Sequence, residues 1–403
     1  MLDILAPFRV KPYRDYKLDG PANGAAVAAG LANADWYQTP VERKLLKQLM
    51  QRSDGPALRH TAIWIGLILL TGSLGVAFWG TWWAVPCFLV YGVLYTSAAD
   101  SRWHEMGHGT AFKTAWMNDV VYEFASFLMM RNPVVWRWSH ARHHTDTIIV
   151  GRDPEISNMR PTQLVLLAIG MTGVTGLPQI LATLIGHARG RLTPAEQDYV
   201  PQTEWPRAYT AARIHVAIYV AVLLTCLATW SIIPALLIGL PRAYGIWLLI
   251  LMGLPQHAGL QEDVLDHRLN ARTVLMSGPL RFIYSNMNYH VEHHMYPMVP
   301  YHALPRLHEA VKHDCPAPCP SLVAAWQEII PAYLRQRSDP TYFLVKQLPP
   351  GQGRRGLRNW PQNNHCKLNR SAGAGNGSNQ PEICPGVGKA ARPCRAMDLG
   401  RKE

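Results

Sequence analysis

Residues 290–294 read His-Val-Glu-His-His, and the same His-x-x-His-His pattern stands at 140–144 as His-Ala-Arg-His-His. A related cluster, His-Glu-Met-Gly-His, occupies 104–108. Side chains three or four residues apart share one face of a helix, so two histidines of each cluster can reach one metal ion. The additional histidine of the two longer clusters points elsewhere and can serve a second ion. These three clusters, hereafter the histidine boxes, therefore predict a centre for two metal ions carried on helices.

The donor atoms leave the identity of the metal open, because imidazole suits zinc, copper, iron and nickel. A carboxylate-bridged helix bundle would instead repeat Glu-x-x-His pairs. Glu105 precedes His108 by three residues, but the boxes at 140–144 and 290–294 do not repeat that pair. The boxes therefore favour a centre built on histidine alone.

The sequence also predicts roles for other polar residues near the boxes. Ligating histidines usually donate their second ring N–H to a carboxylate or carbonyl, and Asp100 and Asp263 are expected in that role. His302, His308 and His313 follow the third box at mixed spacing and are expected to be solvated.

Apolar runs flank the boxes. A first pair covers 61–80 and 82–98, and a second pair covers 211–230 and 232–254. Each run approaches the roughly 20 residues that a membrane-spanning helix needs, and a short break separates the members of a pair. The sequence therefore predicts an all-α integral membrane protein with two transmembrane helical hairpins, about four spans, and a cytoplasmic helical cap that carries the metal centre.

Two apolar segments depart from this simple pattern. Pro241 and Arg242 interrupt the run at 232–254 and can mark a break in its helix. The segment 162–186 is apolar but rich in Gly, Thr and Pro. It is expected to be interfacial or re-entrant, with a full span as the alternative.

Lys and Arg set the expected orientation. They gather before residue 61, from 99 to 160, from 187 to 213 and after 255, whereas the two hairpin loops carry almost no charge. Basic flanks stay in the cytoplasm. The protein is therefore expected to be multi-pass in the cell inner (cytoplasmic) membrane, with both termini and all boxes on the cytoplasmic side.

The chain divides into four expected parts. Residues 1–59 form a cytoplasmic N-terminal segment, 60–312 the membrane domain with the boxes, and 313–348 a C-terminal helical segment of the cap. Residues 349–403 are rich in Gly, Asn, Pro and Arg. Such a composition buries little apolar surface, so this basic tail is expected to be disordered.

The motifs HEMGHGT at 104–110, WSHARHHTDT at 138–147 and NYHVEHHMYP at 288–297 occur in this order, with apolar hairpins between them. In this respect the chain resembles the membrane fatty-acid desaturase and hydroxylase superfamily, over roughly 60–312. The resemblance implies a non-haem di-iron oxidoreductase with two irons and O2 as oxidant. One further ligand is implied before the third box, and the place is taken by His257 in LPQHAGL. The implied iron ligands are His104, His108, His140, His143, His144, His257, His290, His293 and His294.

The resemblance also implies an external source of electrons. The sequence shows no GxGxxG after a strand and no ferredoxin-type cysteine set. The expected donor is a ferredoxin-type protein with a separate reductase, and a formal net charge of +12 would attract an acidic partner. The other expected partners are membrane lipid and a small-molecule or acyl substrate, with no nucleic acid among them.

Within the superfamily, two features favour hydroxylation over desaturation. The His257 context looks like that of alkane hydroxylases. The stretches QEDVLDHRLNARTV at 261–274 and VPYHALPRLHEAV at 299–311 resemble the hydrocarbon oxygenase branch of rhizopine catabolism. This branch implies oxidative demethylation of an O-methyl inosamine. A fatty-acyl (lipid) desaturase is the alternative.

Two readings from other classes fit the sequence less well. A metal transporter would place its ligands near the middle of the bilayer in broken helices, whereas the boxes lie beyond the apolar runs. A structural metal-binding membrane protein has no need of nine ligands for two ions. The pattern therefore favours an enzyme.

Overall fold

The computed structural model describes residues 10–157 and 159–350 of the chain. Within these residues every regular element is helical, and extended backbone forms only the isolated bridges Thr273–Tyr289 and Val274–Cys319. The all-α class is therefore confirmed for the described part. The expected disordered tail begins at 349, and residues 351–403 lie outside the described residues.

In the described part, two stretches are long and apolar enough to cross a membrane, Arg43–Ala77 and Gln202–Thr229. They contain α3 (Asp54–Ala77) and α11 (Trp205–Thr229), which correspond to the first apolar run of each predicted pair. Few of their apolar side chains are buried within the protein. Such outward-facing apolar surface is what a lipid environment favours.

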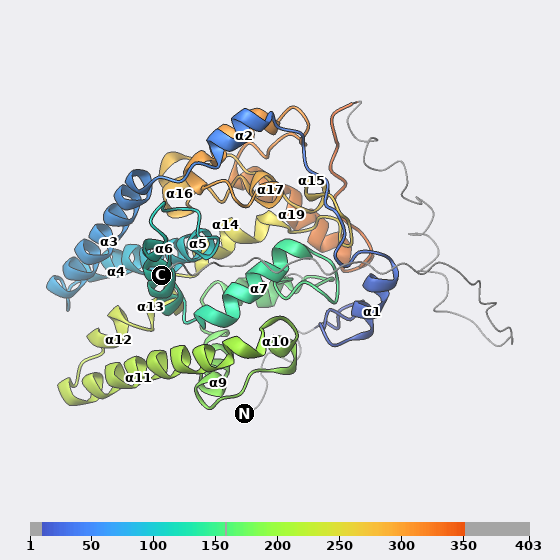
Figure 1. Cartoon of the computed structure of the whole chain (residues 1–403). Helices are drawn as coiled ribbons and strands as arrows, with labels where there is room; N and C mark the ends of the chain where they lie inside the picture. Colours follow the sequence, from blue (N-terminus) through green and yellow to red (C-terminus); the bar gives the residue numbers. More distant parts are fainter. Residues whose placement is uncertain (1–9, 158, 351–403) are drawn as a thin grey trace, which may run out of the picture. The chain divides into compact units, whose positions relative to one another are not determined.

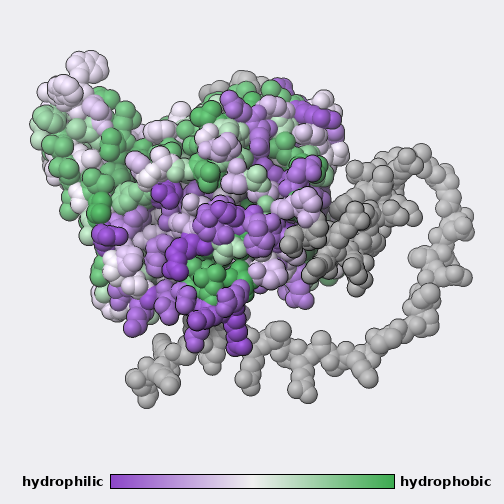
Figure 2. Space-filling view, turned by 90° about the horizontal axis from the view of Figure 1, so that it is seen from above, coloured by the Kyte–Doolittle hydropathy of each residue, from purple (hydrophilic) through white to green (hydrophobic). Residues whose placement is uncertain are grey.

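The apolar surface is gathered on one side. Helices α3 and α11 project toward the same side of the described part (Figure 1). Hydrophobic residues collect over the side from which α3 and α4 (Ala84–Gly92) project, whereas hydrophilic residues cover much of the remaining face (Figure 2). This division agrees with the membrane character expected from the apolar runs.

The second run of each pair differs from a simple spanning helix. The run at 82–98 forms α4 and a π-helical turn, η2 (Val93–Ser97), which leads directly into α5 (Ala98–Gly107). Pro241, which lacks a backbone N–H, accounts for a first break, a second break falls at Gly245, and the run at 232–254 is thus divided into three short helices. These are α12 (Ile233–Leu237), α13 (Pro241–Tyr244) and α14 (Trp247–Gly253). The break at Pro241 is thus present, and the count of about four spans stays a prediction.

The apolar segment 162–186 is also divided, into α8 (Leu164–Gly170) and α9 (Leu177–Ala188). A helix rises about 1.5 Å per residue, so neither helix can cross a hydrocarbon core of about 30 Å. No single helix of this segment is long enough to span, and whether the segment is interfacial, re-entrant or spanning stays a prediction.

A close backbone crossing joins the two apolar regions. A Cβ atom on Gly245 would lie 1.9 Å from the carbonyl oxygen of Gly92. The Ser97 hydroxyl donates to the Gly245 carbonyl at 2.6 Å and accepts from the backbone N–H of Leu249 at 2.8 Å. Small residues allow such approaches between membrane helices. The crossing holds η2, which leads directly into α5 and the first box, against α14, which leads to His257.

Shorter helices complete the described part, and a segment N-terminal to α3 runs over several of them. The backbone N–H of Tyr37 donates to the Leu265 carbonyl at 2.9 Å, and the side chain of Gln38 donates to the Met295 carbonyl at 2.8 Å. The remaining elements are α1 (Pro21–Ala28), α2 (Arg43–Leu49), α6 (Ala115–Leu128), α7 (Pro133–Thr145), α10 (Pro194–Tyr199), η3 (Gln202–Glu204), η4 (Leu254–Gln256), α15 (His267–Asn270), α16 (Gly278–Ile283), α17 (His290–Met295), η5 (Tyr301–Ala303), α18 (Leu304–Val311) and α19 (Leu322–Gln336).

Replacing Gly245 by Ala is expected to destabilise the fold, because the added methyl group would overlap the Gly92 carbonyl. A loss of about 3 kcal/mol, the upper end for overpacking, is expected. Thermal unfolding in detergent measures the effect. Gly66→Ala in α3 is the matched control, since nothing lies within 4 Å of a Cβ there. Equal unfolding midpoints for the two variants would contradict the importance of the crossing.

Candidate metal centre

Three helices and one turn carry the nine histidines. His104 lies in the last turn of α5 and His108 follows it directly, while His257 follows η4. The second box occupies the C-terminal half of α7, which begins at Pro133 with the Asn132 side chain accepting from the Val134 N–H at 3.1 Å. The third box makes up most of the short helix α17. These helices meet in the interior, so residues far apart in sequence become neighbours.

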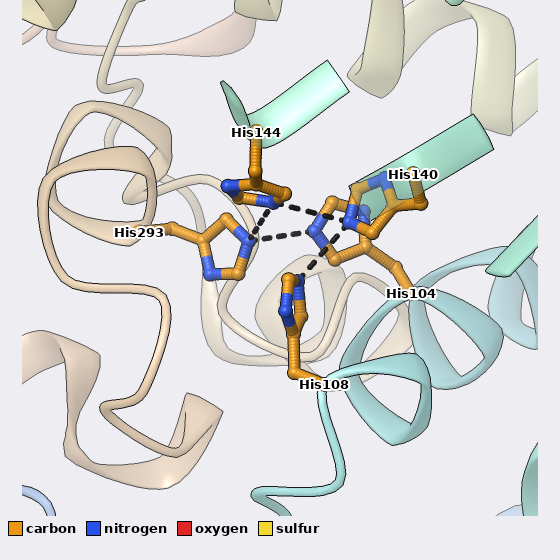
Figure 3. Close-up of side chains that lie close together, drawn as sticks. All are labelled: His104, His108, His140, His144 and His293. Atoms are coloured by element: carbon orange, nitrogen blue, oxygen red, sulfur yellow. Dashed lines mark hydrogen bonds between the residues drawn. The ribbon is translucent and has the colours of Figure 1, made fainter. Parts of the chain in front are cut away.

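One set of ligand atoms forms a five-histidine group, His104, His108, His140, His144 and His293. Its rings point their nitrogens toward one another from α5, α7 and α17 (Figure 3). The Nε2 atoms of His104 and His293 lie 2.7 Å apart, and His144 is 3.2 Å from His293. All five ligand atoms lie within 4.8 Å of one another.

The other four histidines form a second group, His143, His257, His290 and His294. The Nε2 atom of His290 lies 2.9 Å from that of His257 and 2.9 Å from that of His294. The structure thus brings together all nine residues that the sequence singled out, and it divides them into two groups. Boxes two and three contribute to both groups, as expected for adjacent histidines that point in different directions.

The donor set fits metal ions. Metal-bound imidazole nitrogens lie about 2.1 Å from the ion, so two at right angles lie about 3 Å apart. The nitrogens observed here are separated by 2.7–3.2 Å. Burial, reinforced by neighbouring histidines, holds the pKa of His144 and His293 well below the usual value. Both rings are therefore neutral, which is the form that binds metal.

Three of the nine histidines have the second ring nitrogen held by an oxygen acceptor. The Nδ1 atom of His143 lies 2.8 Å from the Asp153 carboxylate, and that of His140 lies 3.3 Å from Glu155. The Nδ1 atom of His257 lies 2.7 Å from the Asn270 carbonyl oxygen. With Nδ1 donating to these oxygens, each Nε2 lone pair is free for metal.

A cavity of about 360 Å³ lies beside both groups. His104 of the five-histidine group and His143, His257 and His290 of the four-histidine group contribute to its wall. His108 and His144, which are half-buried, do not line it. The metal-binding side chains therefore face an internal space large enough for a small molecule.

A comparison with protein families accounts for this arrangement. The sequence model described as fatty acid desaturase matches residues 80–326, more than half of the 403 residues and all nine histidines. The chain belongs to the fatty acid desaturase family. Its members are membrane-associated oxidoreductases that use O2 and typically hold two irons. The chain is therefore an oxygen-dependent membrane oxygenase or desaturase, and its histidine groups can bind the metal.

In this desaturase-family chain, the carboxylates expected beside the ligands do not contact them. Asp100 pairs with Arg131 at 2.5 Å, and Asp263 pairs with Arg14 at 2.6 Å. Asp153 and Glu155 take the role instead. The segment after α7 turns back on the helix, so these residues, 10 and 15 positions beyond their histidines, reach the box.

His308 is also placed differently from the expectation. It is buried rather than solvated, and its Nδ1 lies 2.5 Å from the Glu292 carboxylate in the third box. The other oxygen of Glu292 accepts from the Thr273 hydroxyl at 2.6 Å. Glu292 is thus held from two sides, which fixes the orientation of α17.

Replacing Asp153 by Asn is expected to weaken Fe²⁺ binding about 10- to 100-fold, the usual effect of removing an acceptor behind a ligating histidine. Competition with a chelator measures the affinity. Asp263→Asn is the control, because Asp263 contacts Arg14 and the Val150 N–H rather than a histidine. Unchanged affinity in Asp153→Asn would exclude this carboxylate from supporting the metal centre.

Proposed function

We propose that the chain is a di-iron oxygenase that hydroxylates a C–H bond of a small polar substrate, with the nine histidines as iron ligands. The O-methyl group of a rhizopine-type inosamine is the candidate position. Hydroxylation of an O-methyl carbon gives a hemiacetal, which collapses to formaldehyde and a free hydroxyl. The observation that supports a polar substrate is the charged wall of the cavity beside the histidines.

Two ion pairs border this cavity. Asp100 and Arg131 are joined at 2.5 Å, and the Arg160 Nε lies 3.1 Å from Glu262. The amide of Gln336 lies on the same wall. An alkyl chain packed against such groups displaces water without replacing its hydrogen bonds, which costs free energy. The hydroxyl and amino groups of a polar molecule can replace those hydrogen bonds.

Arg131 is held in a fixed position at the wall. Its guanidinium lies 4.6 Å from the centre of the Trp103 ring and 4.4 Å from that of Trp136. Cation–π contacts at these distances are favourable, and Arg carries five N–H donors in a rigid plane. Arg131 is therefore suited to orient a substrate through its oxygen atoms.

The irons supply the redox chemistry of the overall reaction, R–H + O2 + 2e⁻ + 2H⁺ → R–OH + H2O. The residues of the chain position the participants. Asp153 and Glu155 hold the N–H groups of their histidines, and the cavity presents the C–H bond to the wall formed by His104, His143 and His290. Six of the nine histidines are buried, which limits the access of water to the centre.

Electrons are proposed to come from a ferredoxin-type protein with its own reductase. The net charge of +12 favours an acidic donor. The basic flanks of the apolar runs support a location in the inner membrane, with both termini and the donor on the cytoplasmic side.

A fatty-acyl desaturase is the second candidate, because the cavity also has an apolar part. Its apolar lining residues are Ile148, Ile156, Leu249, Ile250, Leu254 and Leu260.

The two candidates give different products. With iron, a ferredoxin, its reductase and ¹⁸O-labelled O2, an O-methylated inosamine is expected to yield formaldehyde. The label is expected in the formaldehyde when it is trapped before its hydrate exchanges oxygen with water, as measured by mass spectrometry. Conversion of a fatty-acyl chain to its alkene, with the label in water and none in the organic product, would instead establish the desaturase.

Replacing Asp100 and Arg131 together by Leu is expected to lower kcat/KM for the polar substrate about 10- to 100-fold, since a charge-assisted hydrogen bond contributes about 1.5–3 kcal/mol. Removing both charges avoids leaving one buried and uncompensated. Steady-state kinetics and iron content are measured together.

The matched control for this double variant replaces Asp119 and Arg137 by Leu. These residues form an exposed ion pair at 3.0 Å between α6 and α7, away from the cavity. Its kcat/KM is expected to stay near that of the unmodified protein. Equal kinetics for both double variants would remove the support for a polar substrate.

A further inference from the structure

Three aromatic rings lead from the surface to the four-histidine group. Trp36, which is partly exposed, lies face to face with His267, with ring centroids 4.2 Å apart and ring planes 2° from parallel. The ring of His267 lies 4.9 Å from that of His294. His294 belongs to the four-histidine group, and its Nε2 is 2.9 Å from that of His290. Ring contacts therefore connect the protein surface to a metal-binding histidine.

The stack is held in place by hydrogen bonds at its outer end. The indole N–H of Trp36 donates to the carbonyl of Thr145, at the end of α7, at 3.0 Å. The backbone N–H of the next residue, Tyr37, donates to the Leu265 carbonyl at 2.9 Å. These two bonds attach the segment that carries Trp36 both to the second box and to the loop before His267.

His267 has no other evident role. It is 2% exposed and belongs to neither histidine group. Its Nδ1 is buried without a hydrogen-bond partner among the residues that the structure describes. An unsatisfied buried polar atom costs about 1–3 kcal/mol, which an aliphatic side chain would avoid. His267 contacts its neighbours Trp36 and His294 through its flat aromatic ring.

The stack approaches the metal centre from outside the substrate cavity. None of Trp36, His267 and His294 lines that cavity, whereas His143, His257 and His290 of the same group do. A protein that docks over Trp36 would therefore leave the substrate in place. The same segment continues into α2, which exposes Arg43, Lys44 and Lys47 and can attract an acidic partner.

We propose that Trp36 and His267 form the route by which electrons pass from a reduced iron–sulfur carrier protein to the metal centre. The inference rests on the proposed function, because only a metal centre that consumes electrons needs such a route. Each carrier gives one electron. Two carriers are oxidised as two ferric ions become ferrous, and no bond is made or broken. Closely spaced rings favour the transfer because electron tunnelling weakens steeply with each gap between non-bonded atoms.

The test uses the full-length chain loaded with ferric iron and a reduced [2Fe–2S] ferredoxin, mixed without O2. The absorbance of the ferredoxin reports the rate of electron transfer at saturating ferredoxin. Trp36→Leu is expected to slow this rate by an order of magnitude. Trp36→Phe, which retains a ring, is expected to recover most of the rate. His267→Leu is expected to slow it as Trp36→Leu does.

Three further measurements separate a relay from a structural role. Iron content and reduction by dithionite are expected to be unchanged in Trp36→Leu, and the ferredoxin affinity, measured by calorimetry, sets the saturating concentration at which the rates are compared. Trp116→Leu, which removes an indole that is 61% exposed on α6, is the control and should match the unmodified protein. Loss of iron, or equal slowing with dithionite, would assign Trp36 a structural role and overturn the proposal.

The unmodified protein separates failure of the relay from failure of the proposed function. A chain that binds no iron contradicts the proposed function itself. If dithionite reduces the iron and ferredoxin does not, both the proposed class of carrier protein and the proposed route are overturned. A third outcome is that ferredoxin reduces the iron at the same rate in the unmodified protein, in Trp36→Leu and in His267→Leu. That result would overturn the route through Trp36 and leave the proposed function standing.

Discussion

Nine imidazole rings meet in the interior, and each must present a nitrogen without a proton to bind metal; the other features of the site follow from that constraint. Neutral rings whose Nε2 atoms lie as close as 2.7 Å satisfy one another poorly by hydrogen bonding, because each contact can hold one proton at most. Each ring therefore depends on a metal at one nitrogen and gains from an acceptor at the other. Asp153, Glu155 and the Asn270 carbonyl supply such acceptors.

The same constraint explains how the apolar helices serve the site. Six rings come from the end of α5, from α17 and from the turn after η4, and their spacing tolerates little movement. The backbone contact between Gly92 and Gly245 and the two hydrogen bonds of Ser97 fix this spacing at the base of the site. The π-helical turn η2 places Ser97 at this point, and such turns often occur near functional sites.

Features encoded by short-range spacing could be predicted from the sequence. The histidine boxes depend on helical periodicity, and α3 and α11 depend on apolar run length. Pro241 also marks the first break within 232–254, whereas the second break, at Gly245, has no proline to mark it. Contacts across long separations in the chain could not be foreseen, because no local pattern links Glu292 to His308 or Trp36 to His267. The sequence shows Asp153 and Glu155 only as acidic residues near the second box. Their contacts with His143 and His140 depend on the path of the loop after α7.

The sharing of α7 and α17 between the two histidine groups has a thermodynamic consequence. Each helix contributes ligands to both groups. In α7, His140 and His144 belong to the five-histidine group and His143 belongs to the four-histidine group. An ion that binds first restrains both helices and so lowers the conformational entropy that the second ion must still remove. By linkage, the second ion strengthens the retention of the first to the same extent. This shared scaffold favours positively cooperative metal loading and works against the electrostatic repulsion between two bound cations.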